Sequence, residues 1–203
     1  MHRRGVQEGE GGCHGGKGMC NAAVCVGVAG PGKARPRTNM AATPARSCLP
    51  MAIDIPEGFT ALKLRPNPYI DACGPLYGKR EGDRFVLGLR VERRHCNPGG
   101  TCHGGMLSTL ADMLLVLGSG AQSGLHRYMV TINLSSDFMS AAPEGCWLEG
   151  RMEVLRVTRN LVFCQGLLTQ GDQTVLRMSG ITKPMGEPDP SGSLAAYLGD
   201  GPE

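Results

Sequence analysis

The sequence lacks a long hydrophobic run. No stretch of eighteen consecutive apolar residues occurs among its 203 residues. The richest apolar stretch, Met106 to Gly118, is too short to span a bilayer and contains Asp112. The first residues also lack the apolar segment of a secretory signal peptide. We therefore expect no membrane association and no export.

The sequence also lacks the cysteine spacing of a disulfide framework. Its nine cysteines are an odd number. Four fall in the first fifty residues, and the other five are scattered along the rest of the chain: Cys73, Cys96, Cys102, Cys146 and Cys164. We interpret them as reduced thiols and expect a cytoplasmic protein.

The part of the chain that we expect to fold has no excess of positive over negative charge. Residues 1–50 contain seven Lys and Arg against two Asp and Glu, whereas residues 51–203 contain fourteen against sixteen. The formal net charge of +3 therefore comes from the first fifty residues. Because nucleic-acid-binding proteins carry positive charge on their folded part, we expect no nucleic-acid partner.

The two ends of the chain differ in composition from its middle. Residues 1–50 contain ten Gly and four Pro and show no hydrophobic periodicity, so we expect a disordered extension. Met40 and Met51 each open a more protein-like stretch, and an alternative start at either one stays open. Residues 187–203 contain three prolines and are expected to form a flexible C-terminal tail.

Residues 51–186 show the periodicities of one folded domain. The pattern predicts a helix from Gly104 to about Ala121 that has no polar face and is therefore buried on all sides. The predicted strands cover Phe85–Glu92, Tyr128–Phe138, Cys146–Val157, Leu161–Thr169 and Gln173–Lys183, with Gly-, Pro- and Asn-containing turns between them. We expect an α+β fold in which an antiparallel sheet wraps around a central buried helix.

A Gly- and Pro-rich loop precedes the predicted helix. It contains Asn97 and His103 and ends at the pair Gly104–Gly105, where the helix begins. The free backbone N–H groups at a helix start carry the positive end of the dipole and suit an anion or a developing oxyanion. The alternative is a tight turn that needs glycine for steric reasons alone.

Asp112 is the only charged side chain between His103 and His126, and it lies among apolar residues. A buried carboxylate is costly, so this one needs a partner, water or a substrate; a half-exposed position or a structural hydrogen bond is the alternative. Asp112 lies eight residues beyond Gly104, or about 12 Å along a helix axis. If both act on one substrate, they must come from different subunits, which predicts a site at a dimer interface.

These residues resemble the hotdog-fold acyl-CoA thioesterases, and among them the phenylacetyl-CoA-thioesterase-like branch. The resemblance covers roughly residues 75–185. It is carried by Asn97, by His103-Gly104-Gly105, by Asp112, and by two runs that follow, Val130–Leu134 and Phe138–Ala142.

The resemblance implies roles for individual residues. The Gly104 N–H would polarise the thioester carbonyl, and Asp112 of the partner subunit would act as general base or as nucleophile. Thr131 would orient the attacking water, and Asn97 and His103 would shape the carbonyl and sulfur side of the site. The expected substrate-binding residues are Gly105, Met106, Met113, Phe138, Arg156 and Arg159, the last two as contacts to CoA phosphates.

The resemblance also implies an acyl-CoA substrate, no metal and no separate cofactor, since CoA is part of the substrate. It implies a homodimer, and a homotetramer built from two dimers. Arg156 and Arg159 flank Thr158, where the family usually has Gly, so a solvated turn is the alternative for them.

Three other functions compete with hydrolysis. A hotdog dimer could bind acyl-CoA as a sensor or scaffold, although Asp112 and Thr131 together argue against a site without a base. A zinc site could use His95, Cys96, Cys102 and His103, but their spacing matches no common structural-zinc pattern. Hydratase chemistry would need an Asp-His pair on the loop, which offers Asn97 and His103 instead.

Overall fold

The computed structural model describes residues 54–189 and 193–199. All of these described residues lie in one compact unit of the chain. The predicted disorder of residues 1–50 lies outside the described residues.

A single long helix, α2 (Gly104–Gln122), forms the centre of the domain. Its start is set by His103, whose side chain caps the first turn by accepting a hydrogen bond from the Gly105 N–H. Its end is followed by Gly124, where a φ of +71° requires the left-handed conformation that favours glycine. The helix predicted from the sequence is confirmed within one or two residues.

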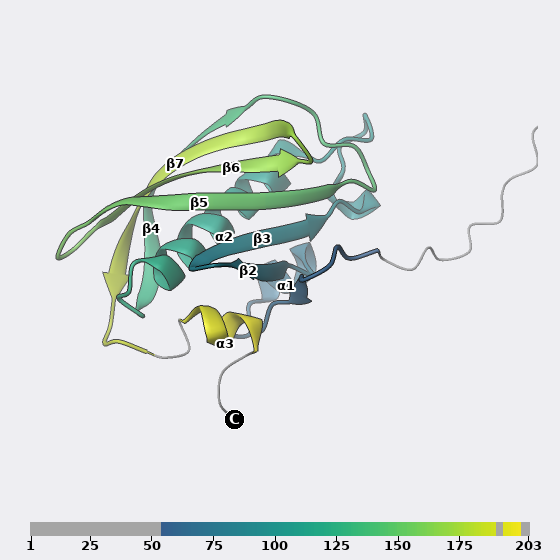
Figure 1. Ribbon diagram of the computed structural model, residues 1–203. Coiled ribbons are helices and arrows are strands. Elements are labelled where there is room, and N and C mark those ends of the chain that lie inside the picture. The colour runs from purple at the N-terminus through teal and green to yellow at the C-terminus, as the bar shows by residue number, and fades with distance from the viewer. Residues whose placement is uncertain (1–53, 190–192, 200–203) are drawn as a thin grey trace, which may run out of the picture. The chain divides into compact units, whose positions relative to one another are not determined.

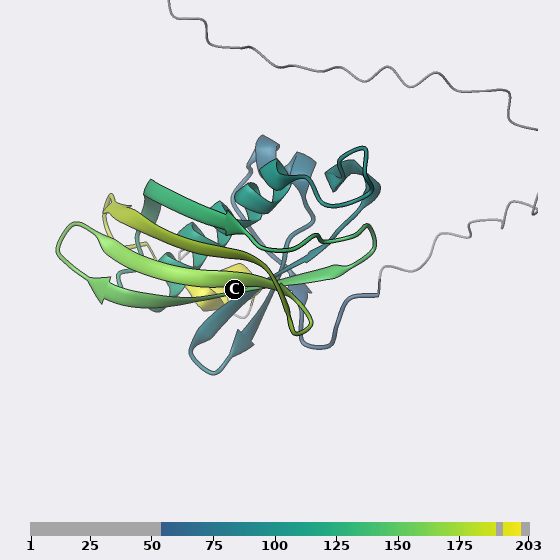
Figure 2. The same cartoon turned by 90° about the horizontal axis from the view of Figure 1, so that it is seen from above.

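In the described part of the chain, seven antiparallel strands form one sheet that curves around α2 (Figures 1 and 2). In chain order they are β1 (Thr60–Ala61), β2 (Tyr77–Glu81), β3 (Arg84–Arg90), β4 (Tyr128–Phe138), β5 (Trp147–Val157), β6 (Val162–Gln170) and β7 (Gln173–Met185). Their order across the sheet is β1-β2-β3-β5-β6-β7-β4. The expected α+β fold with a sheet wrapped around a helix is therefore confirmed.

Strand β4 follows α2 in the chain but lies at the far edge of the sheet, where it pairs with β7. The chain then crosses to β5, which pairs with β3 and β6. The register between β4 and β7 shifts between Thr131 and Asn133, so Ile132 forms a bulge. One long side of β4 is consequently left without a strand partner in the described part of the chain.

The core lies between α2 and the concave face of the sheet. Its fully buried side chains come from both layers and include Phe85, Leu87, Leu89, Leu110, Leu114, Leu115, Leu148, Leu168 and Leu176. Burying each such side chain contributes about 1.5–3 kcal/mol to the stability of the fold, so this interface holds α2 against the sheet. By length and composition α2 could also cross a membrane, but 61% of that stretch is buried inside the fold.

The prediction that α2 is buried on all sides is wrong for one stripe. Ser108, Thr109, Asp112 and Val116 are only half-buried, and they follow one another at the three- and four-residue spacing of a single helix face. The sheet covers the other faces of α2 but does not reach this one. Ser108, Thr109 and Asp112 thus lie on the face that the fold leaves open, whereas Ser119 is buried and accepts a hydrogen bond from the Thr182 hydroxyl.

Five short elements of the described residues were not predicted. They are the strands β1 and β2, the helix α1 (Pro68–Cys73), the 3₁₀ turn η1 (Arg93–His95) and the helix α3 (Leu194–Leu198). Helix α3 lies within residues 187–203, which we expected to be a flexible tail. Instead Leu194 is buried in the core, and the Lys63 N–H donates to the Tyr197 carbonyl at 3.0 Å. Apolar Leu194, Tyr197 and Leu198 explain the docking of this segment.

Candidate active site

The first turn of α2 presents backbone N–H groups that have no partner among the described residues, and one of them is that of Gly104. His103 Nδ1 accepts from the Gly105 N–H at 2.9 Å, and the His103 carbonyl accepts from the Leu107 N–H. No hydrogen bond among the described residues uses the Gly104 N–H. A β-carbon at Gly104 would be in ordinary contact with the Phe138 ring at 3.5 Å, so crowding does not explain glycine there.

The loop before α2 is closed by its own side chains. Asn97 Oδ1 accepts from the N–H groups of Gly99 and Thr101 at 2.9 and 3.3 Å, and Asn97 Nδ2 donates to Thr101 Oγ1 at 3.0 Å. The Asn97 amide therefore holds the turn that leads to the helix start. This structural role stands beside the role in carbonyl binding that the resemblance implies.

His95 anchors the other end of this loop. It is buried, its Nδ1 accepts from the Glu92 N–H at 3.0 Å, and its carbonyl accepts from the His103 N–H at 2.7 Å. Burial lowers the pKa of His95, and the nearby Arg94 lowers it further. A neutral His95 thus helps to fix the backbone just before Gly104.

Asp112 and Thr131 meet on the open face of α2. The Thr131 hydroxyl donates to Asp112 Oδ1 at 2.7 Å, and both side chains are half-buried. Because Thr131 occupies one carboxylate oxygen, it fixes the orientation of the other. A carboxylate held in this way can accept a proton from a water molecule beside it.

The Asp112–Thr131 pair opens into a cavity of about 810 Å³. Its inner wall is apolar and comes from Leu64, Met113, Val116, Leu117, Met129 and Tyr197. Charged side chains stand among the remaining lining residues, and one of them, Arg65, is paired with Asp189. The cavity combines one polar pair with a largely apolar interior, as small-molecule sites commonly do.

The predicted site residues fall into two groups within one chain. Asp112, Thr131 and Met113 line the cavity. Gly104, Gly105, His103 and Asn97 lie at the start of α2 and do not line it. Gly104 and Asp112 are eight positions apart on α2, which separates the two groups by about 12 Å along the helix axis.

The remaining predicted substrate contacts lie apart from the cavity. Met106 is 8% exposed and packs in the core. Phe138 is 55% exposed, and its ring approaches the start of α2 at Gly104. The structure thus joins Phe138 to the Gly104 group rather than to the Asp112 group.

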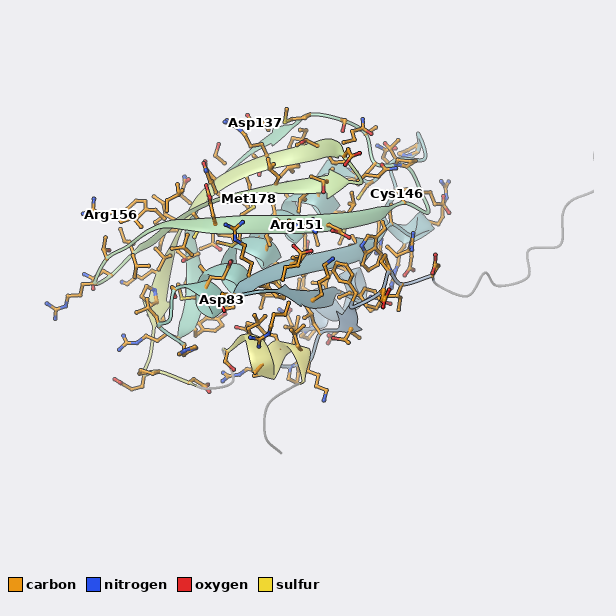
Figure 3. The ribbon with its side chains drawn as sticks, viewed as in Figure 1. Asp83, Asp137, Cys146, Arg151, Arg156 and Met178 are labelled. Atoms are coloured by element: carbon orange, nitrogen blue, oxygen red, sulfur yellow. The ribbon has the colours of Figure 1, made fainter. Side chains whose placement is uncertain are left out.

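Arg156 and Arg159 lie at the β5–β6 turn, away from the core, as Figure 3 shows for Arg156. Both side chains are exposed, and neither has an ion-pair partner among the described residues. Thr158 closes the turn, since its hydroxyl donates to the Leu161 carbonyl at 2.9 Å and accepts from the Leu161 N–H at 3.0 Å. Threonine therefore builds this turn without the glycine expected from the resemblance.

Several cavity residues were missed by the sequence reasoning. Val116, Met129 and Leu117 carry the signal of ordinary core positions. Leu64 and Tyr197 come from segments at the two ends of the domain, and no periodicity in the sequence connects those segments to Asp112. Only the folded arrangement brings them to the site.

The zinc alternative finds no support in the described part of the chain. Across residues 54–189 and 193–199, no group of three or more His, Cys, Asp or Glu side chains is placed to hold a metal ion. Cys102 is buried, and burial raises the pKa of its thiol to about 12. His103 is instead engaged in capping α2.

Comparison with known proteins agrees with this geometry. Residues 99–176 match the thioesterase superfamily. The chain is also 37% identical over 130 residues to the esterase candidate PA0474 of Pseudomonas aeruginosa, an alignment that covers 64% of this chain and 96% of that protein. The chain therefore belongs to the thioesterase superfamily, and its fold is the hotdog fold of the family that its sequence resembles.

Solved structures support the same fold. The conserved protein PA5202 of Pseudomonas aeruginosa gives a TM-score of 0.54 at 23% identity, covering 59% of this chain and 95% of its own. The Escherichia coli PaaI protein of the phenylacetic acid degradation operon gives 0.54 at 20%, covering 60% and 87%. A hypothetical thioesterase protein of Streptococcus pneumoniae, solved with coenzyme A, gives 0.50 at 22%, covering 59% and 93%.

Proposed function

We propose that the protein hydrolyses acyl-CoA thioesters at sites that two subunits build together. The observation that carries the proposal is the Asp112 carboxylate, held by the Thr131 hydroxyl at 2.7 Å and open to a cavity. Membership of the thioesterase superfamily supports the reaction type. The Streptococcus pneumoniae relative of the same fold, solved with coenzyme A, supports CoA as the carrier.

The edge of the sheet supports the homodimer. Among the described residues no strand pairs with the outer side of β4, and this strand exposes Tyr128, Val130 and Ile132 by 68%, 38% and 54%. An unpaired, apolar edge is a template for pairing with another strand. Pairing with β4 of a second copy around a two-fold axis would continue the sheet and cover these side chains.

The same two-fold axis would bring the two halves of the site together. It would set two α2 helices antiparallel beside each other with their open faces in contact. If the helices meet at Ser108, which is midway between Gly104 and Asp112, then Gly104 of each subunit faces Asp112 of the other. Ser108 is small and half-buried, which permits close approach. Each dimer would contain two sites.

The chemistry at each site follows from these groups. Asp112 removes a proton from water as the oxygen attacks the thioester carbonyl carbon. The electrons of the carbonyl bond move to its oxygen, and the Gly104 N–H of the partner subunit stabilises that negative charge. The carbon–sulfur bond then breaks, giving the free acid and the CoA thiolate. Because a thiolate leaves readily, no strong general acid is required.

The remaining parts of the proposal concern binding, assembly and location. Arg156 and Arg159 are exposed cations at the β5–β6 turn and are suited to the phosphates of CoA. We propose that dimers pair further into a tetramer and that the protein works in the cytoplasm. The reaction as written uses no metal and no additional cofactor.

Thiol release from a panel of acyl-CoAs tests the proposal, with wild type compared with Asp112→Asn. Asparagine keeps the oxygen that accepts from Thr131, so the fold and the dimer should persist. Loss of the base should lower kcat by about 10²–10⁴-fold. Equal turnover by both proteins would reject Asp112 as the base. Saturable acyl-CoA binding without thiol release by wild type would reject hydrolysis and favour the sensor or scaffold.

A further inference from the structure

The cavity next to Asp112 extends in one direction along α2. Asp112, Met113, Val116 and Leu117 line it in succession, which carries it from the middle of the helix toward its C-terminal end. Met129 on β4 lines the opposite wall. The α2 and β4 residues named here are apolar except for Asp112, whereas the other charged side chains of the cavity come from segments outside α2 and β4, namely Lys63, Arg65, Arg127, Glu187 and Asp189. The side of the arm formed by α2 and β4 therefore suits a hydrocarbon group.

Helix α3 closes the far end of this arm. Ala196 and Tyr197 both line the cavity. The Tyr197 hydroxyl lies 3.5 Å from the position that a β-carbon on Gly120 would occupy, which places it beside the last turn of α2. Burial raises the pKa of Tyr197, so its phenol is neutral at physiological pH.

Several contacts fix Tyr197 in this position. Its ring packs against Phe85 with the ring centroids 6.4 Å apart. Its carbonyl accepts from the Lys63 N–H at 3.0 Å, and Ser193 caps α3 by accepting from the Ala196 N–H at 3.2 Å. The wall is therefore attached to the core and to the segment that supplies Leu64.

The distance from Asp112 to this wall limits the acyl group. Gly120 lies eight positions beyond Asp112, which corresponds to about 12 Å along the helix. An extended alkyl chain advances about 1.25 Å per carbon, because its bonds of about 1.5 Å follow a zigzag. About eight to ten carbons therefore fit between the carboxylate and the Tyr197 ring.

We propose that Tyr197 is a specificity-determining residue that ends the acyl pocket and sets the length of the acyl chain at about eight to ten carbons. This inference rests on the proposed hydrolysis, because it treats the cavity arm as the acyl half of that site. Tyr197 on α3 packs beside Gly120, about 12 Å along α2 from Asp112, and is therefore too far from Asp112 to take part in the chemistry.

The test measures kcat/KM for straight-chain acyl-CoAs from butanoyl to hexadecanoyl. For wild type, kcat/KM should rise about fourfold per added methylene and stop rising near the decanoyl chain, where the pocket ends. In Tyr197→Ala the rise should continue, so that the ratio of dodecanoyl to octanoyl activity increases at least about tenfold. Butanoyl-CoA, which does not reach the wall, should be hydrolysed equally by both.

Two further variants keep the test decisive. Tyr197→Phe retains the ring and should keep the wild-type profile. Tyr197→Leu retains an apolar contact with Phe85 and should shift the profile in the same direction as Tyr197→Ala, which covers the case in which the alanine variant does not fold. A folded Tyr197→Ala or Tyr197→Leu enzyme with the wild-type chain-length profile would overturn the proposal.

Binding separates this proposal from hydrolysis itself. S-Alkyl-CoA thioethers from butyl to hexadecyl have no carbonyl and cannot be hydrolysed, so calorimetry reports only the fit of the chain. If the thioethers show the same dependence on length and on Tyr197 while no acyl-CoA is hydrolysed, the pocket assignment stands and the proposed reaction fails. If hydrolysis occurs but neither profile responds to Tyr197, the reaction stands and the pocket assignment fails.

Discussion

Replacing Gly104 by proline removes the proposed oxyanion donor and little else. Gly104 is the first residue of α2, where proline is well tolerated because its N–H has no partner within the helix. The preceding residue, His103, has φ −63° and ψ 138°, which is the extended conformation that a residue before proline prefers. The fold should therefore accept Gly104→Pro.

The expected cost falls on the chemical step. Loss of one oxyanion donor typically lowers kcat by about 10²–10³-fold. Gly104→Ala is the matched control, because it retains the N–H and its β-carbon would make only ordinary contact, 3.5 Å from the Phe138 ring. The alanine variant should remain within a few-fold of wild type.

Thiol-release kinetics and thermal unfolding measure the two effects separately. We expect Gly104→Pro to keep the wild-type melting temperature within a few degrees while kcat falls. Our reasoning would be refuted by a folded proline variant that keeps a third or more of the wild-type kcat. Equal losses in the proline and alanine variants would also contradict it, since they would indicate a steric effect.

Two further predictions concern a positioning residue and an ion pair. Thr131→Val removes the hydroxyl that orients Asp112. Because hydrogen bonds to charged groups contribute about 1.5–3 kcal/mol, this variant should lower kcat by about 10–100-fold with little change in KM. An unchanged kcat would show that Thr131 does not position Asp112. The Arg151 guanidinium, with Lys79, lowers the pKa of Glu81 from 4.5 to about 2. This stabilisation is present above pH 4.5 and is lost as the pH falls toward 2; because the pair is exposed, it should contribute no more than about 1 kcal/mol. In Glu81→Gln, the free energy of unfolding measured with denaturant should no longer show this loss between pH 4.5 and 2. The same loss in the variant as in wild type would argue against the ion pair.

Local sequence patterns predicted the elements with strong periodicity. Helix α2 and strands β4 to β7 begin and end within two residues of their predicted bounds. They could be predicted because their apolar residues recur at the spacing of one buried face and because turns with Gly, Pro or Asn separate them. The short elements α1, β1, β2 and α3 were not predicted, since a few residues give no periodic signal.

Features that depend on distant parts of the chain could not be predicted locally. The pairing of β4 with β7 instead of β5 leaves the open edge and the open stripe of α2, and no local pattern encodes it. Leu110 and Leu114 are buried completely in the core while Val116 lines the cavity, and nothing in the apolar pattern of the helix distinguishes these two kinds of position. Tyr197 reaches the cavity only because α3 folds back onto β2 and α2.

Complementation between two inactive variants is the most direct test of a site shared by two subunits. Asp112→Asn and Gly104→Pro subunits are co-expressed with different affinity tags, and the heterodimer is purified through both. If each site is shared by two subunits, one of the two sites of the heterodimer combines the intact Gly104 of one subunit with the intact Asp112 of the other. The account predicts about half of the wild-type activity for this heterodimer, against almost none for either parent. A heterodimer as inactive as its parents would contradict the shared site.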